Sequence, residues 1–289
     1  RSLVDAGLIE VTEENVYRKP VLKSDLSGKD GTAKQLSAEQ QAVVDAISQD
    51  YSLGISQTYL LRGITGSGKT EVYMALIERM IASGKQAIVL IPEIALTYQT
   101  LLRFYLRFGD RVSVMNSRLS PGERSDQYER AAKGEIDIMI GPRSALFTPF
   151  ERLGLVIIDE EHESSYKSET MPKFHAREVA QELCRMKHAS LLLGSATPSL
   201  ESYYRARQGE IPLFTLNSRL TGGELPKVYV EDLREELKSG NRSIFSRRLQ
   251  QLLEDRLAKE QQSILFLNRR GYAGFVSCRA CGHVMKCPH

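Results

Sequence analysis

A glycine-rich turn between an apolar strand and a helix constrains this chain more than any other feature. The turn runs from Gly63 to Thr70 with the sequence GITGSGKT, which fits the pattern G-x-x-x-x-G-K-[ST] without a mismatch. The backbone N–H groups of such a turn and the positive end of the following helix form a cradle for phosphates. Lys69 would reach the β- and γ-phosphates, and the Thr70 hydroxyl would ligate Mg²⁺. The turn therefore predicts a nucleoside triphosphate site.

Strands and helices alternate along the chain after this turn. Apolar strands are expected at 87–91, 112–115, 136–140, 155–158 and 190–193, and amphipathic helices at 71–82, 94–107, 122–132 and 175–187. Strands separated by such helices form right-handed βαβ units, which build a parallel sheet covered by helices on both faces. The ligand-binding loops of these sheets lie at the carboxyl ends of the strands. The pattern predicts an α/β fold with its functional loops along one edge of the sheet.

Composition excludes few classes of partner. The chain has 289 residues, of which 42% are hydrophobic and 26% are charged, as in an ordinary soluble globular protein. Its 39 Lys and Arg against 36 Asp and Glu leave a net charge of +3, which neither favours nor excludes nucleic acid. We see no apolar run as long as a membrane span and no signal peptide, so we expect no membrane partner and a cytoplasmic location.

Two further strand ends carry side chains suited to phosphoryl transfer. After strand 155–158, Asp159 is placed to hold Mg²⁺, and Glu160 is placed to orient and deprotonate an attacking water. After strand 190–193, hydroxyl residues such as Ser195 and Thr197 can hydrogen-bond His162 from a neighbouring strand end. We expect these last three residues to couple the nucleotide site to a second site, although a plain strand-end turn would explain the same composition.

Gln40 admits two interpretations. It follows Ser37 by three residues, as the glutamine of a helix capping box does. A glutamine shortly before a phosphate-binding turn can instead read an adenine edge, because its amide donates and accepts at once. Lys69, Asp159 and Glu160 are the expected catalytic residues. The residues expected to hold ATP and Mg²⁺ are Gln40, Gly63, Ile64, Thr65, Gly66, Ser67, Gly68, Lys69, Thr70, Asp159 and Glu160.

Several motifs in a fixed order resemble those of superfamily 2 helicases. They are GITGSGKT at 63–70, PEIALT at 92–97, GPRSALF at 141–147, DEEH at 159–162 and GSATP at 194–198. Two longer strings, DEEHESSYK from Asp159 and FLNRRGY from Phe266, are similar to those of the bacterial primosomal replication-restart helicases. This resemblance implies ATP-driven 3′→5′ unwinding of DNA in replication restart and primosome assembly at stalled forks. It also implies partners: single-stranded and forked DNA, single-stranded-DNA-binding protein and other primosome proteins.

The resemblance also implies a domain plan for a fragment of a longer protein. The expected parts are the end of a winged-helix-like domain at 1–17, a linker at 18–35, a first RecA-like helicase lobe at 36–225, the start of a second lobe at 226–275 and the beginning of a cysteine-rich region at 276–289. A helix at 246–260 and a strand at 264–267 would open the second lobe. The arginine that speeds hydrolysis in such helicases comes from that lobe, so we expect this chain to bind nucleotide but to hydrolyse it poorly.

A single-stranded DNA track is implied by the same resemblance. The residues expected to contact DNA are Thr97, Gln99, Arg143, Ser144, Tyr166, Lys167 and Phe174. Arginines and hydroxyls make positioning contacts to phosphates, and aromatic rings stack on bases without sequence preference. Taken alone, Arg143 is better explained as an ordinary surface arginine, and the alternative for the aromatic loop is that its rings pack on the lobe.

Three of the four cysteines lie in the last dozen residues and predict a zinc site. Cys278 and Cys281 form a Cys-x-x-Cys turn that places two thiolates at neighbouring corners of a tetrahedron. Cys287 would be the third ligand, and the resemblance puts the fourth beyond His289. A reduced cysteine turn without metal is the alternative, and the remaining Cys184 is expected in the core.

Two other classes of function are compatible with these motifs. A nucleotide-binding regulatory module would have an ATP affinity that does not respond to DNA. A zinc-dependent scaffold for primosome proteins would keep its partner binding after Lys69→Ala.

Overall fold

The computed structural model describes residues 35–220, 226–266, 276–277 and 283–285. The chain divides into two compact units, residues 1–223 and 224–289. The predicted winged-helix end at 1–17 and nearly all of the linker at 18–35 lie outside the described residues. Within the described part of the chain, none of the helices has the length and apolar character needed to cross a bilayer.

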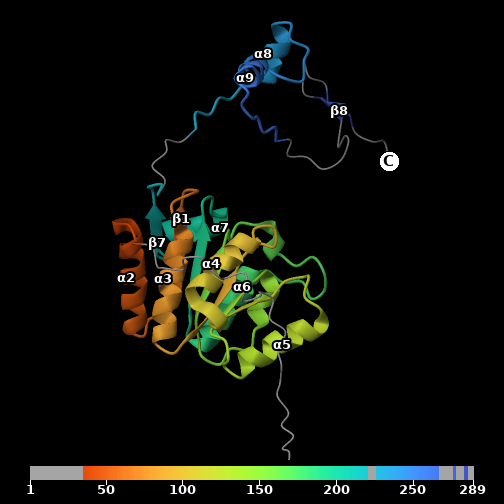
Figure 1. Cartoon of the computed structure of the whole chain (residues 1–289). Coiled ribbons are helices and arrows are strands. Elements are labelled where there is room, and N and C mark those ends of the chain that lie inside the picture. Colours follow the sequence, from red (N-terminus) through yellow and green to blue (C-terminus); the bar gives the residue numbers. More distant parts are fainter. Residues whose placement is uncertain (1–34, 221–225, 267–275, 278–282, 286–289) are drawn as a thin grey trace, which may run out of the picture. The chain divides into compact units, whose positions relative to one another are not determined.

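The first unit is built on a seven-stranded sheet in which every pair of neighbouring strands is parallel. The strand order is β3-β4-β2-β5-β6-β1-β7. The strands are β1 Thr58–Gly63, β2 Gln86–Leu90, β3 Val112–Val114, β4 Ile138–Gly141, β5 Leu153–Asp159, β6 Ser190–Ser195 and β7 Leu213–Leu216. The predicted α/β fold is confirmed (Figure 1). The strand ends that carry the phosphate-binding turn and the acids, those of β1 and β5, flank the end of β6 in the strand order.

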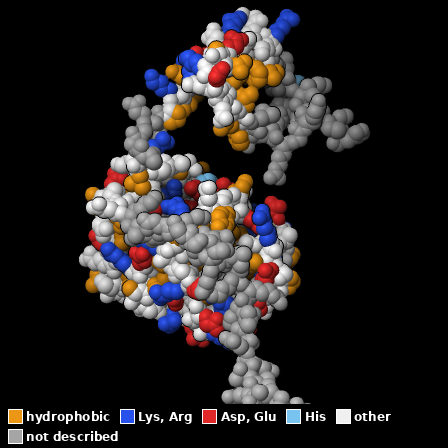
Figure 2. Space-filling model, in the orientation of Figure 1, with side chains coloured by type: hydrophobic (Ala, Val, Ile, Leu, Met, Phe, Trp, Pro, Cys, Tyr) orange, Lys and Arg blue, Asp and Glu red, His pale blue; other side chains and the backbone are white. Residues whose placement is uncertain are grey.

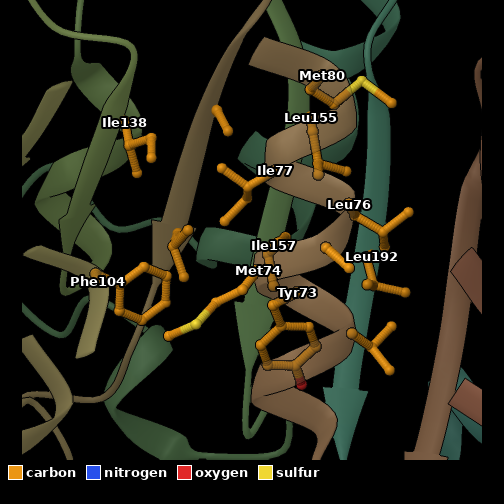
Figure 3. Close-up of a cluster of buried hydrophobic side chains, with 14 of the residues drawn as sticks. Tyr73, Met74, Leu76, Ile77, Met80, Phe104, Ile138, Leu155, Ile157 and Leu192 are labelled. Carbon is orange, nitrogen blue, oxygen red and sulfur yellow. The ribbon is translucent and has the colours of Figure 1, made fainter. Parts of the chain in front are cut away.

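Helices cover both faces of this sheet, each over its own core. The helices are α2 Ala38–Ser52, α3 Lys69–Ala82, α4 Tyr98–Phe108, α5 Pro121–Ala132, α6 Ala176–Lys187 and α7 Leu200–Arg207. Side chains of α2, α3 and α4 join one apolar cluster, and side chains of α5, α6 and α7 join the other. Successive strand residues point to opposite faces, so Leu61 belongs to the first cluster and Leu60 to the second. Figure 3 shows α3 packed by Leu76 and Ile77 against the sheet in the first cluster.

Some element boundaries differ from the sequence prediction. The helix expected at 94–107 begins only at Tyr98, because the Thr97 side chain accepts a hydrogen bond from Thr100 N and caps it there. Strand β7 and helix α7 were not among the predicted elements, since they are short, with four and eight residues. The strand expected at 264–267 is wrong for its described residues, which form no strand. Ile264, Leu265 and Phe266 are exposed, and a strand forms only where a neighbour pairs with it.

The second unit holds two helices and a short hairpin in its described residues. They are α8 Leu233–Lys238, α9 Arg247–Ala258, and β8 Val276–Ser277 paired antiparallel with β9 Val284–Met285. Helix α9 confirms the helix predicted at 246–260. The Glu236 carboxylate of α8 accepts a hydrogen bond from Asn241 Nδ2 at 2.6 Å and one from Arg247 N at 3.2 Å, which ties the start of α9 to α8.

Candidate functional site

The phosphate-binding turn has the conformation that its glycines predict. It leaves β1 at Gly63 and enters α3 at Lys69, with positive φ at Gly66 (84°) and Gly68 (79°). A Cβ at Gly63 would lie 2.6 Å from Ser67 Oγ and 3.0 Å from Lys69 Cγ, so the tight turn requires glycine there. Gly68, the N-cap of α3, has no side chain to bond the first helical N–H groups. These donors therefore lie at the turn, where an anion can meet them.

The polar side chains of the turn fit a phosphate ligand. Lys69 Nζ donates a hydrogen bond to Gly63 O at 3.0 Å and lies 3.8 Å from Glu160 Oε1. The Ser67 hydroxyl is buried and forms no hydrogen bond within the described part of the chain. A buried hydroxyl without a partner is uncommon in folded proteins, and a phosphate oxygen would supply one. The turn thus combines a cation, the N-terminus of a helix without a side-chain cap and an unsatisfied hydroxyl, as a triphosphate needs.

Gln40 supports this turn from α2. Its side-chain Oε1 accepts from Ser37 N at 2.8 Å, and Ser37 Oγ accepts from Gln40 N, so the capping-box interpretation is confirmed. Its Nε2 donates to Ser67 O at 2.9 Å. Gln40 is 1% exposed, and both ends of its amide are hydrogen-bonded within the protein. Gln40 therefore positions the turn in this structure, and adenine recognition by its side chain stays a prediction.

The two acids at the end of β5 have different surroundings. Asp159 Oδ1 accepts a hydrogen bond from the Tyr73 hydroxyl at 2.8 Å. Burial raises the pKa of the Asp159 carboxyl, as does the nearby Glu160, while Tyr73 and Lys69 oppose the shift. Glu160 takes a left-handed backbone conformation (φ 47°), which is uncommon for a residue with a side chain and often marks functional sites. Asp159 and the Thr70 hydroxyl offer the oxygen ligands that Mg²⁺ prefers.

His162 and Ser195 meet as predicted. His162 Nδ1 and Ser195 Oγ share a hydrogen bond of 2.7 Å between the ends of β5 and β6. The same histidine nitrogen lies 3.6 Å from Glu160 Oε2. Thr197 also contacts Ser195, because its backbone N–H donates to Ser195 Oγ at 3.0 Å. The contact is confirmed, and its role in coupling stays a prediction.

A buried ion pair beside this contact was missed by the sequence reasoning. The Glu161 side chain has 0% exposure and accepts from Arg177 Nη1 at 2.9 Å. It also accepts from Ser199 N at 2.6 Å, Ser199 Oγ at 3.0 Å and Ser202 Oγ at 3.0 Å. This carboxylate ties the end of β5 to α6 and α7. The run of acids at 159–161 was the only indication of this residue in the sequence, and such a run does not distinguish a buried acid from an exposed one.

A groove next to the acids contains several of the residues predicted to bind DNA. It has a volume of about 290 Å³ and is lined by Pro92, Glu93, Asn116, Ser117, Arg124, Pro142, Arg143, Ser144, Ser165 and Tyr166. These residues follow β2, β3, β4 and β5 at their carboxyl ends. In Figure 2, basic and acidic side chains are interspersed over the described part of the visible face. The groove lining itself contains two arginines and one glutamate, so binding of a phosphodiester here would rest on local contacts.

The structure assigns different positions to the other predicted DNA residues. Arg143 Nη1 donates to Ser165 O at 2.9 Å and to Lys167 O at 3.0 Å, so it holds the loop that follows the acids. Thr97 caps α4, and Gln99 is exposed in the first turn of that helix, outside the groove lining. Phe174 packs edge-on against Phe147 with 5.6 Å between ring centroids, and Phe147 is 56% exposed.

The prediction that the Tyr166 ring stacks on bases is wrong for this structure. The residue is 1% exposed and belongs to the core on the α6 side of the sheet. Its hydroxyl donates to Asp159 O at 2.6 Å and lies 3.1 Å from Leu90 O, where it joins the ends of β5 and β2. Lys167, the next residue, is exposed, because the short 3₁₀ turn Ser164–Tyr166 buries only the tyrosine.

Acid is expected to loosen the start of α6. His175 is the N-cap of this helix, and its Nδ1 accepts a hydrogen bond from Arg177 N at 3.2 Å. Burial and then the Arg177 charge lower the pKa of His175 below its ordinary value of 6.5. The folded state therefore prefers neutral histidine, and its contribution to stability, present above pH 6.5, is lost as the pH falls through the folded-state pKa. A helix cap is worth about 0.5–2 kcal/mol.

His175→Asn supplies the matched control, because asparagine caps a helix without titrating. The midpoint of thermal unfolding, measured against pH, should fall more steeply in acid for the wild type than for the variant. Parallel curves for the two proteins would contradict a role for His175 protonation.

The predicted zinc ligands Cys278, Cys281 and Cys287 lie outside the described residues. Among the residues that are described, no group of three or more His, Cys, Asp or Glu side chains is arranged to hold a metal ion. The zinc site stays a prediction. Cys184 is buried in the core as predicted, and burial raises the pKa of its thiol to about 12.

Comparison with known proteins assigns a family to this site. A family model described as DEAD/DEAH box helicase matches residues 37–206, which include the turn, both acids and the His162–Ser195 pair. The chain is 47% identical over 289 residues to the replication restart protein PriA of Bacillus subtilis (strain 168), covering 100% of this chain and 36% of the relative. It is 43% identical over 299 residues to the replication restart protein PriA of Synechocystis sp., covering 100% of this chain and 35% of the relative.

A solved structure shares the fold. The crystal structure of the DUF1998 helicase MrfA matches with a TM-score of 0.53 at 18% sequence identity, covering 82% of this chain and 36% of that one. The chain spans only 36% and 35% of the length of the two restart proteins. The family model, in contrast, matches more than half of this chain, and the chain belongs to the DEAD/DEAH box helicase family.

Proposed function

We propose that this chain forms the ATP-binding lobe of an ATP-dependent DNA helicase that acts in replication restart. The observation that carries the proposal is the meeting of the phosphate-binding turn with the acids of β5, where Lys69 Nζ lies 3.8 Å from Glu160 Oε1. Membership of the DEAD/DEAH box family and the likeness to replication restart proteins support it.

In this proposal the residues of the site divide the work of phosphoryl transfer. The turn and the N-terminus of α3 bind the phosphates, and Lys69 leaves its hydrogen bond with Gly63 O to meet the terminal phosphates. Asp159 and Thr70 would hold Mg²⁺, which neutralises charge that develops on the phosphates. Glu160 orients a water and takes its proton. His162, 3.6 Å from Glu160 and bonded to Ser195, would report the state of this site to the neighbouring strand end.

We propose that single-stranded DNA lies along the groove at the ends of β2 to β5. Arg143 and Ser144 line the groove, and the Phe147–Phe174 pair offers an aromatic surface of the kind on which bases stack. Movement in the 3′→5′ direction, action on forked DNA, and partners such as single-stranded-DNA-binding protein and other primosome proteins rest on the resemblance alone.

Nucleotide binding tests the proposal most directly. Titration of the chain with a fluorescent ATP analogue in the presence of magnesium chloride should give saturable binding. Lys69→Ala should weaken this binding at least about tenfold, because losing a charge that pairs with a desolvated partner costs roughly 2 kcal/mol or more. Lys187→Ala, which removes an exposed lysine from the last turn of α6, is the matched control and should bind as the wild type does.

Addition of single-stranded DNA separates the candidate functions. A helicase lobe should show nucleotide binding or turnover that responds to DNA. Binding that is lost in Lys69→Ala but indifferent to DNA would favour a regulatory nucleotide-binding module. Absence of saturable binding by the wild type would refute the nucleotide site itself.

A further inference from the structure

A tyrosine hydroxyl reaches the proposed Mg²⁺ ligand from inside the core. Tyr73 lies on α3, four residues and about one turn after Lys69, and it is 1% exposed. Figure 3 shows its ring within the apolar cluster, in the company of Ile157 and Leu192. The hydroxyl nevertheless donates to Asp159 Oδ1 at 2.8 Å. None of the motifs in the sequence singled out this tyrosine.

The space for this hydroxyl exists because the residue opposite Asp159 is a glycine. In the parallel pairing of β5 with β6, Asp159 is the register partner of Gly194. A Cβ on Gly194 would overlap the Tyr73 hydroxyl and would lie 2.8 Å from Tyr73 Cζ. The glycine of the GSATP motif is therefore required by Tyr73 of α3, which lies outside the motifs.

The hydrogen bond restrains the Asp159 carboxylate. Oδ1 of Asp159 accepts from the Tyr73 hydroxyl, and a buried carboxylate that is hydrogen-bonded in this way is held in one orientation. Tyr166 holds the same residue by its backbone, since its hydroxyl donates to Asp159 O at 2.6 Å. Two tyrosine hydroxyls thus restrain Asp159, one at the side chain and one at the main chain.

We propose that Tyr73 is a positioning residue for the divalent cation of the nucleotide site: its hydrogen bond fixes the orientation of the Asp159 carboxylate, the proposed metal ligand. This inference rests on the proposed function. Helix α3 would then carry both Lys69, which meets the phosphates, and the donor that orients the metal ligand. Outer donors of this kind change metal affinity by roughly 10–100-fold in other metal sites.

Tyr73→Phe tests the inference, since it removes only the hydroxyl and keeps the ring in the core. The measured quantity is the ratio of the dissociation constants of a fluorescent ATP analogue in EDTA and in saturating magnesium chloride. In the variant, we expect the gain in affinity on adding magnesium to fall roughly tenfold or more. The affinity in EDTA should stay at the wild-type value, because the phosphate-binding turn is intact. A purely structural role would lower both affinities together.

Tyr59→Phe is the matched control. Tyr59 is also buried, and its hydroxyl also donates to an aspartate, Asp50, at 2.9 Å, but it lies at the start of β1 away from the turn. The ratio of its dissociation constants in EDTA and in magnesium chloride should equal that of the wild type. An unchanged ratio in Tyr73→Phe, with nucleotide still bound, would overturn this inference alone. A wild type that binds no nucleotide would overturn the proposed function and this inference with it.

A second measurement needs no nucleotide. Tyr73→Phe and Asp159→Ala each remove one end of the same hydrogen bond, so their effects on the thermal unfolding midpoint should be smaller together than the sum of the two. Gly194→Ala should likewise lower the midpoint less in the Tyr73→Phe background, where the overlapping hydroxyl is gone. Additive effects in both pairs would contradict the geometry on which the inference stands.

Discussion

Replacing Glu161 by alanine is expected to lower the free energy of unfolding by about 3–5 kcal/mol, as removal of one partner of a buried ion pair does. The Glu161 side chain has 0% exposure, and Arg177 is 16% exposed at its side chain. The variant would leave the Arg177 guanidinium largely out of water with no carboxylate beside it, and it would strip the Ser199 N–H of its acceptor. Urea unfolding, followed by circular dichroism, measures the change.

Two variants separate the buried charge from other effects. Glu161→Ala combined with Arg177→Met should be more stable than Glu161→Ala alone, because the uncompensated charge is then removed as well. Glu169→Ala, which removes an exposed acid from the following loop, should change stability by no more than about 0.5 kcal/mol. Equal losses in Glu161→Ala and Glu169→Ala would show that the buried pair contributes nothing specific.

In a protein that contains this lobe together with a complete second lobe, replacing Glu160 by glutamine is expected to reduce DNA-stimulated ATP turnover by roughly 10²–10⁴-fold. The amide can still lie beside Lys69 and His162, but it cannot take a proton from water. Nucleotide affinity should remain close to the wild-type value, because the Lys69 cation and the turn are untouched. Steady-state phosphate release, measured beside binding of a fluorescent ATP analogue, distinguishes the chemical step from binding.

The neighbouring acid Glu163 provides the control for this prediction. Glu163→Gln makes the same change three residues later, beyond the contacts with Lys69 and His162, and should keep turnover within about twofold, the scale of an ordinary surface change. A Glu160→Gln protein that hydrolyses ATP at the wild-type rate would rule Glu160 out as the base. A variant that loses binding and turnover together would make Glu160 a binding residue instead.

Much of the site could be predicted because its parts are local. The phosphate-binding turn is eight consecutive residues, and Gly63, Gly66 and Gly68 determine its shape by what their missing side chains allow. Asp159 and Glu160 follow directly on a run of apolar strand residues, and parallel strands bring such ends to one edge of the sheet. The His162–Ser195 contact followed from the same reasoning and has the expected partners.

Other contacts could not be predicted because sequence context does not reveal which way a side chain points. Tyr166 in an aromatic and basic loop predicted base stacking, yet the 3₁₀ turn before Lys167 directs its ring into the core. The sequence around Gln40 gives no sign that its amide bonds Ser67 O and so supports the turn. Glu71 reads as an ordinary first-turn acid of α3, yet it is buried and pairs with Arg103 and Arg107 of α4.

The sequence by itself determined the class of fold, the phosphate-binding turn and the acids at the strand ends, since each depends on residues within one or two elements. Only the tertiary structure decided how these parts are held. Tyr73 and Asp159 are 86 residues apart, and their hydrogen bond exists because β5 and β6 pair in the register that sets Gly194 opposite Asp159. Glu161 is buried because α6 and α7 bring Arg177 and Ser199 to it. Such contacts depend on packing between distant segments, which no local pattern of residues encodes.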